Sequence, residues 1–135
     1  MSFNQLAYTQ STFIPDNNFE QALINLGYDT LPLNNMVPTA NIQNVQQLNI
    51  SDRNISNLTG IEDFTSLANL NCSGNNLTVL DVSNNLNLST LNCHSNLLTS
   101  LDLSNNPNVF SLLCNNNNIS DLNVSANFLL TEINC

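Results

Sequence analysis

The four cysteines of this chain stand at equal intervals, and this spacing restricts the possible folds more than any other feature. Cys72, Cys93, Cys114 and Cys135 follow one another with the same gap each time. A leucine or isoleucine stands two residues before each of them. Self-similarity at a fixed period of this length indicates stacked structural units rather than a globular arrangement of unrelated elements. A unit this short buries its apolar side chains only against its neighbours, so the chain is predicted to form stacked coils.

Each unit has the pattern L-x-C-x-x-N-x-L, with isoleucine as an alternative to leucine. It covers residues 70–77, 91–98 and 112–119, and residues 133–135 begin a fourth copy. Leu80, Leu101 and Leu122 keep the same period, and the unit upstream, from Leu48 to Leu70, is longer by a single residue. This is the signature of a leucine-rich repeat. We predict an α/β solenoid, mostly β and loop, whose right-handed coils place parallel β-strands on the concave face behind an N-terminal helical cap.

Period-two alternation in L-x-C predicts a short strand with one buried face. Leu70 and Cys72 point inward, whereas Asn71 and Ser73 point outward. The same outward positions recur in each coil and form the predicted ligand-binding face. They are Asn71, Ser73, Asn92, His94, Leu113 and Asn115, with Asn49, Ser51 and Asn134 in the outer coils. Leu113, an apolar residue in an outward position, is the single residue most expected to contact a ligand.

Asparagines are predicted to join one coil to the next at the turn that leaves each strand. Asn75, Asn96 and Asn117 occupy this position. An amide side chain both donates and accepts, so it is able to satisfy buried backbone groups of its own coil and of a neighbour. The first unit has Arg53 instead of asparagine at this place.

The cysteines are predicted to form a ladder of buried thiols made of Cys72, Cys93 and Cys114. Gaps as long as theirs do not match the usual spacing of zinc ligands. Disulfides are also disfavoured, because parallel, in-register side chains keep neighbouring Cβ atoms roughly 5 Å apart, beyond the usual range of about 3.5–4.5 Å. Cys135 is the exception, because an uncovered edge leaves it available for pairing between molecules.

Three regions are predicted along the chain. Residues 1–12 form an N-terminal extension, with disorder as one interpretation, residues 13–44 form the cap, and residues 45–135 form about four and a half coils with no C-terminal cap. Residues 13–27 are predicted as one helix. Asn17 and Glu20 suit a capping box there.

The expected helix buries an apolar stripe of Phe19, Leu23 and Leu26, and Gly27 ends it. A solenoid needs such a cap, because its first coil would otherwise expose leucines to water.

The charge balance excludes several classes of partner. The net charge is −9, and Arg53 is the single cation among the lysines and arginines. Such a surface repels phosphate groups, so neither nucleic acid nor an anionic membrane is expected as a partner. No apolar run reaches the roughly 18 residues that span a bilayer. The first dozen residues also lack the features of a signal peptide.

The repeats resemble the 21-residue cysteine-ladder repeats of bacterial cell-surface internalin-like proteins. Residues 13–51 are similar to the cap of secreted bacterial leucine-rich-repeat proteins. The resemblance implies export, to the medium or the cell surface, and a role in adhesion, recognition or a surface array.

Catalytic and metal-binding interpretations are weaker. His94 follows Cys93, but the alternation places the two side chains on opposite faces, so we predict no enzyme and no cofactor. Asp81 and Asp102 stand one coil apart with Asn123 next in line. Asp16, Asn18 and Glu20 also have the spacing of calcium ligands, but such side chains at the start of a helix are more often caps. Calcium binding by Asp81 and Asp102 stays an alternative. We favour contacts of these carboxylates with backbone or solvent, so no metal site is assigned.

We therefore expect a non-enzymatic module that binds a protein or glycan on its concave face. The alternative is a structural module that stacks end to end as a homo-oligomer through the edge at residues 133–135.

Overall fold

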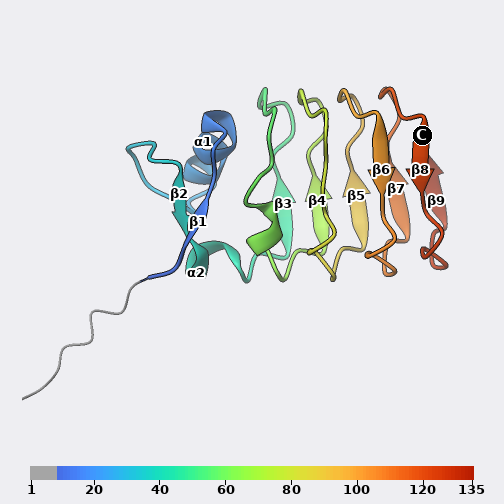
Figure 1. The fold of residues 1–135 in the computed structure, drawn as a ribbon. Helices are drawn as coiled ribbons and strands as arrows, with labels where there is room; N and C mark the ends of the chain where they lie inside the picture. Colours follow the sequence, from blue (N-terminus) through green and yellow to red (C-terminus); the bar gives the residue numbers. More distant parts are fainter. Residues whose placement is uncertain (1–8) are drawn as a thin grey trace, which may run out of the picture.

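The computed structural model describes residues 9–135 as a cap followed by a row of stacked coils (Figure 1). The predicted extension falls largely on residues 1–8, which lie outside the described residues. Ser11 and Thr12, which we placed in that extension, instead belong to strand β1 (Ser11–Phe13).

The coils follow one another in chain order and share one five-stranded parallel sheet (Figure 1). Its strands are β3 (Gln47–Asn49), β4 (Asn69–Asn71), β5 (Thr90–Asn92), β7 (Ser111–Leu113) and β9 (Glu132–Asn134). The central residues pair in register from Leu48 through Leu70 and Leu91 onward. The sequence period therefore equals one coil, as predicted.

A second, two-stranded parallel sheet lies on the other side of the last coils, formed by β6 (Ser100–Asp102) and β8 (Asp121–Asn123). The first coil has a short 3-10 helix, η1 (Ile61–Asp63), instead. We did not predict this second sheet. Each of its strands is only three residues long, and its alternation around Leu101 or Leu122 is too short to separate a strand from a loop.

The cap contains a two-stranded sheet that the sequence did not predict. Strand β1 pairs antiparallel with β2 (Met36–Pro38), and helix α2 (Thr39–Ile42) follows directly. Helix α1 covers Asn17–Asn25, which is shorter than the predicted 13–27. Phe13 belongs to strand β1 instead of the helix, because it pairs with Met36 of β2.

The predicted capping box at Asn17 and Glu20 is wrong. Asp16 is the N-cap of α1, and its Oδ1 accepts hydrogen bonds from the backbone N–H groups of Asn18 and Phe19. The buried Glu20 carboxylate accepts instead from the N–H groups of Asn34 and Asn35. Glu20 therefore fixes the loop before β2 to the helix, whereas Asp16 caps α1.

Asp16 also joins the cap to the first coil. Its Oδ2 accepts from the N–H groups of Ser56 and Asn57 at 2.9 and 3.0 Å. Burial acts to raise the pKa of the Asp16 carboxyl, but the surrounding donors, chiefly Ser56 and Phe19, outweigh burial and lower the pKa from 3.8. The ionised carboxylate of Asp16 thus holds the cap against the first coil.

One continuous apolar core runs from the cap into the coils. Phe19 of α1 stacks on Phe64 of the first coil, with ring centroids 6.3 Å apart. In each later coil, the repeat position that Phe64 holds in the first coil is occupied by a buried asparagine, at Asn85, Asn106 and Asn127. Nδ2 of Asn106 donates to the carbonyl oxygens of Val82 and Asn85 in the preceding coil. This second asparagine ladder was not predicted.

No helix within residues 9–135 is both long enough and apolar enough to cross a lipid bilayer.

Candidate functional site

The outward face of the five-stranded sheet carries a groove of about 500 Å³. Its lining residues come from four neighbouring strands and from the end of α1. They are Leu26, Gln47, Leu48, Asn49, Asn69, Leu70, Asn71, Thr90, Leu91, Asn92, Ser111 and Leu113. We call this the strand-face groove. None of these side chains is ionisable, so the groove is neutral within a chain of net charge −9.

The strands place two columns of polar side chains on either side of a buried leucine. Leu48, Leu70 and Leu91 are at most 2% exposed and form the floor. One column precedes these leucines in each strand and the other follows them. Because side chains one coil apart lie beside each other in register, each column is a row of similar groups about 4.8 Å apart.

The amides of the second column are fixed by contacts to the backbone. Oδ1 of Asn49 accepts from the N–H of Ser51, and Oδ1 of Asn71 from the N–H of Ser73. Oδ1 of Asn92 accepts in the same way from the residue two positions later. These side chains are therefore held in one orientation before any ligand arrives.

Leucines close the two ends of the groove. Leu26 follows the last residue of α1 and is 44% exposed, so its assignment to the buried stripe was wrong. The helix stops there because Gly27 adopts φ 84°, a left-handed conformation that glycine adopts without strain. At the other end Leu113, opposite Asn92, is partly exposed.

The groove contains three of the six predicted contact residues, Asn71, Asn92 and Leu113. Ser73, His94 and Asn115 lie two residues beyond these, after the strands have ended, and none of them lines the groove. Ser73 was expected to point outward but is 5% exposed, because its hydroxyl turns back to Oδ1 of Asn71. The alternation of a strand holds only while the strand continues.

Sequence reasoning missed the other column of the groove and its helical end. Gln47, Asn69, Thr90 and Ser111 stand immediately before the central leucine of their strands, and their outward direction follows from the same alternation. Leu26 had no such signal, because its position depends on where α1 ends.

The predicted asparagine ladder links the coils along one edge of the sheet. Nδ2 of Asn96 donates to the carbonyl oxygens of Cys72 and Cys93, and its Oδ1 accepts from the N–H of Leu77. Asn117 makes the equivalent contacts one coil later. Oδ1 of Asn75 accepts from the backbone N–H groups of Arg53 and Ile55. The first coil, which has Arg53 at the asparagine position, is therefore bound by the asparagine of the next coil.

The cysteine ladder is buried, but the prediction that it holds no disulfide is wrong for the last pair. Cys72 and Cys93 are free and fully buried, whereas Cys114 and Cys135 form a disulfide. The Cα atoms of this pair are 4.5 Å apart, inside the range of about 4.4–6.8 Å that a disulfide spans. Cys135 is thus paired within the molecule rather than available for pairing between molecules.

Burial accounts for the chemistry of the two free thiols. It raises the pKa of Cys93 to about 12 and raises the pKa of Cys72 well above its ordinary value, with the neighbouring Cys93 adding to the effect. A thiol needs its thiolate form to act as a nucleophile or metal ligand. These two side chains therefore serve as small apolar residues of the core.

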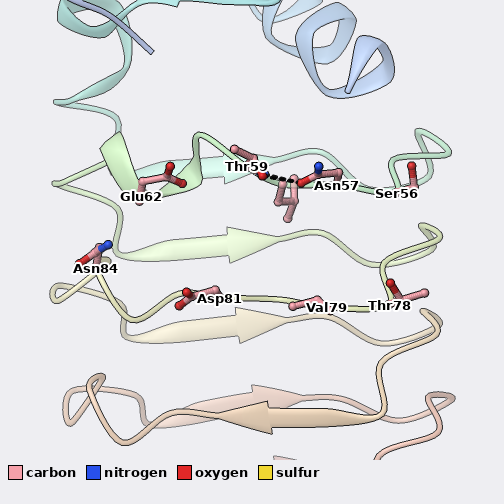
Figure 2. A pocket seen from close by; sticks show the side chains of 9 residues that line it. Ser56, Asn57, Thr59, Glu62, Thr78, Val79, Asp81 and Asn84 are labelled. Carbon is pink, nitrogen blue, oxygen red and sulfur yellow. Dashed lines mark hydrogen bonds between the residues drawn. The ribbon is translucent and has the colours of Figure 1, made fainter. Parts of the chain in front are cut away.

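A second hollow, of about 540 Å³, lies on the side of the coils opposite the five-stranded sheet (Figure 2). Glu62 and Asp81 contribute carboxylates to it, and Asn57 and Thr59 are hydrogen-bonded to each other there. No group of three or more metal-binding side chains occurs within residues 9–135.

Asp81 and Asp102 bind local backbone groups rather than each other. Oδ1 of Asp81 accepts from the N–H of Ser83, and Oδ1 of Asp102 from the N–H of Ser104. The hydroxyl and the N–H of Ser83 lower the pKa of the Asp81 carboxyl, and the N–H and the hydroxyl of Ser104 lower that of Asp102. They are the contacts that the sequence favoured over calcium.

The coils are similar to solved structures of internalins. The functional domain of InlJ from Listeria monocytogenes, which includes a cysteine ladder, shares 34% identity with a TM-score of 0.82 over 93% of this chain. The internalin InlF of the same species shares 27% identity with a TM-score of 0.72 over 85%. This chain spans 28% and 38% of those two structures, respectively.

No protein-family model matches the sequence, and no curated protein sequence is significantly similar to it. The likeness therefore rests on structure together with the repeat itself. The InlJ structure includes a cysteine ladder, the cysteines of this chain lie one coil apart in its core, and the two folds agree over 93% of this chain. We conclude that the chain is an internalin-like leucine-rich-repeat solenoid with a cysteine ladder.

Proposed function

We propose that this chain is a non-enzymatic recognition module of a secreted or cell-surface bacterial protein, and that its ligand binds in the strand-face groove. The observation that carries the proposal is the groove itself. It combines apolar ends with a few polar side chains held in fixed orientations, which is the usual composition of a binding site.

Export is supported by two separate observations. The similar solved structures are internalins of a bacterium. The chain also carries a disulfide between Cys114 and Cys135, and disulfides persist mainly in oxidising surroundings outside the cytosol.

The geometry around His94 supports a role without catalysis. Its Nδ1 lies 2.9 Å from Oγ of the adjacent Ser95. Among the hydrogen bonds of residues 9–135, no carboxylate orients the imidazole ring as a third group would in a catalytic triad. The hydroxyl of Ser95, which contacts the imidazole, also accepts a hydrogen bond from the exposed side-chain amide of Asn116, at 3.5 Å.

The proposal is tested by screening the purified chain against a glycan array and a displayed library of random peptides. Each probe that binds is then measured against two variants. Leu113→Asp places a charge in the groove, whereas Leu97→Asp places the same charge at a 48% exposed leucine that lies outside it.

We expect Leu113→Asp to weaken binding by at least about tenfold, because a buried charge without a partner opposes complex formation. Leu97→Asp should bind like the parent chain. Equal affinity of the parent chain and both variants would show that the ligand binds outside the groove. Light scattering on the same samples separates ligand binding from self-association.

A further inference from the structure

The three asparagines of the groove have a fixed polarity. Oδ1 of each of Asn49, Asn71 and Asn92 accepts from a backbone N–H group, at 3.2, 3.1 and 3.3 Å, and Oδ1 of Asn71 also accepts from the hydroxyl of Ser73. An N–H group only donates, so the side-chain atom that faces it must be the amide oxygen. The orientation of each amide therefore follows from the backbone and leaves no freedom to exchange oxygen and nitrogen.

The other end of each amide is its NH₂ group, a hydrogen-bond donor on a residue that lines the groove. Among the hydrogen bonds of residues 9–135, none uses Nδ2 of Asn49, Asn71 or Asn92. These residues pair directly across β3, β4 and β5. With neighbouring strands about 4.8 Å apart, their NH₂ groups form a row of three donors roughly 10 Å long.

The surroundings of this row determine what it accepts. No lining side chain is charged, so an ionic group entering the groove would lose its hydration without gaining a counter-charge. Leu26 and Leu113 stand at opposite ends and offer apolar surface. The matching ligand is neutral, presents several hydrogen-bond acceptors and carries apolar groups beside them.

We propose that the strand-face groove recognises an uncharged polypeptide segment by its carbonyl groups, which accept hydrogen bonds from the Nδ2 atoms of Asn49, Asn71 and Asn92. Leu26 and Leu113 contact apolar side chains of the same segment. This inference rests on the proposed function, and it adds the chemical class of the ligand and the side-chain groups that contact it.

A polypeptide fits the groove better than a glycan does. Sugar rings commonly pack on aromatic side chains, and none of the groove-lining residues is aromatic. A sugar hydroxyl also donates, whereas the three amide oxygens are already occupied by the backbone. A peptide offers a carbonyl oxygen at every residue and apolar side chains for both leucines.

The donor row is removable without disturbing the coil. Asn71→Asp and Asn92→Asp keep the oxygen that accepts from the backbone but replace the donor by an acceptor. Asp81 already makes this contact with Ser83, so a carboxylate suits the turn. Asn57→Asp is the matched control, because Oδ1 of Asn57 accepts from the N–H of Thr59 outside the groove.

The experiment uses the whole chain and a displayed library of random heptapeptides, with a glycan array alongside. We expect enrichment of uncharged peptides with apolar residues. The double variant Asn71→Asp/Asn92→Asp should bind them at least about tenfold more weakly, which corresponds to the loss of two hydrogen bonds. Asn57→Asp should bind as the parent chain does, and melting curves should show all three proteins folded.

Two outcomes would overturn this inference and leave the proposed function standing. In one, peptides bind and Leu113→Asp abolishes binding, but the double variant binds normally, so the donor row is not used. In the other, only glycans bind in a manner sensitive to Leu113→Asp. Binding that ignores every groove variant would instead remove the proposed function as well.

Discussion

Oδ1 of Asn96 accepts a hydrogen bond of 3.0 Å from the backbone N–H of Leu77, which lies 19 residues earlier in the chain. The same side chain donates to carbonyl oxygens of both coils. One 5%-exposed amide thus satisfies backbone groups of two coils that would otherwise be buried without partners.

Replacing Asn96 by alanine is expected to destabilise the chain by about 1–3 kcal/mol, the cost of leaving buried backbone groups unsatisfied. Chemical denaturation monitored by circular dichroism measures this change. Asn76→Ala is the control, since Asn76 is exposed and should change stability by less than about 0.5 kcal/mol. Equal effects of the two substitutions would contradict the role of the ladder.

Asn106 on the second ladder should also stabilise the stacked coils. Its Nδ2 donates to two carbonyl oxygens of the preceding coil, and it is fully buried. We expect Asn106→Ala to cost about 1–3 kcal/mol, whereas alanine at the neighbouring exposed Asn105 should be nearly neutral. A neutral Asn106→Ala would show that the backbone carbonyls of this side find water instead.

Leu91 tests the apolar floor beneath the groove. It is 1% exposed, so Leu91→Ala is expected to lower the free energy of unfolding by roughly 2–5 kcal/mol. Val79→Ala provides a comparison at a residue that is 73% exposed. If both alanine variants melt together with the parent chain, the coil does not depend on this floor.

The two free thiols should resist alkylation in the folded protein. Cys72 and Cys93 are buried and their pKa values are raised, so the reactive thiolate is scarce at neutral pH. Mass spectrometry after iodoacetamide treatment should find neither labelled in native protein and both labelled in denaturant without reductant. Labelling of four cysteines under the second condition would contradict the disulfide between Cys114 and Cys135.

Asp16 should make stability depend on acidity. Its pKa is lowered in the folded protein, so the unfolded chain takes up this proton more readily than the folded one. The stabilisation is complete above the ordinary value of 3.8 and is lost as pH falls through the lower folded value. Denaturation midpoints measured between about pH 2 and 6 should therefore decline less steeply for Asp16→Asn than for the parent.

The repeat predicted the coils because burial imposes its period directly on the sequence. Leu70, Leu91 and Leu112 occupy one position in successive strands, and their spacing alone gives the register that the structure shows. The Asn71 and Asn92 side of the groove follows from the same alternation. These parts of the structure depend only on residues within one coil and its neighbour.

Features that depend on competition between similar residues were not predictable. Asp16, Asn17 and Asn18 are all good N-cap residues, and the added contacts with Ser56 and Asn57 favour Asp16. The place where α1 ends decides whether Leu26 is covered. The disulfide depends on an approach of 4.5 Å between two Cα atoms, which an idealised strand spacing does not resolve.

The stacked pair of Phe19 and Phe64 has a consequence for protein engineering. Phe64 holds, in the first coil, the place that asparagine holds in later ones, so at this position the cap meets the array through an aromatic contact instead of an amide. A cap transplanted onto another array of this kind must bring the first coil with it. The natural cutting point lies after Leu67, just before strand β4 begins the next coil.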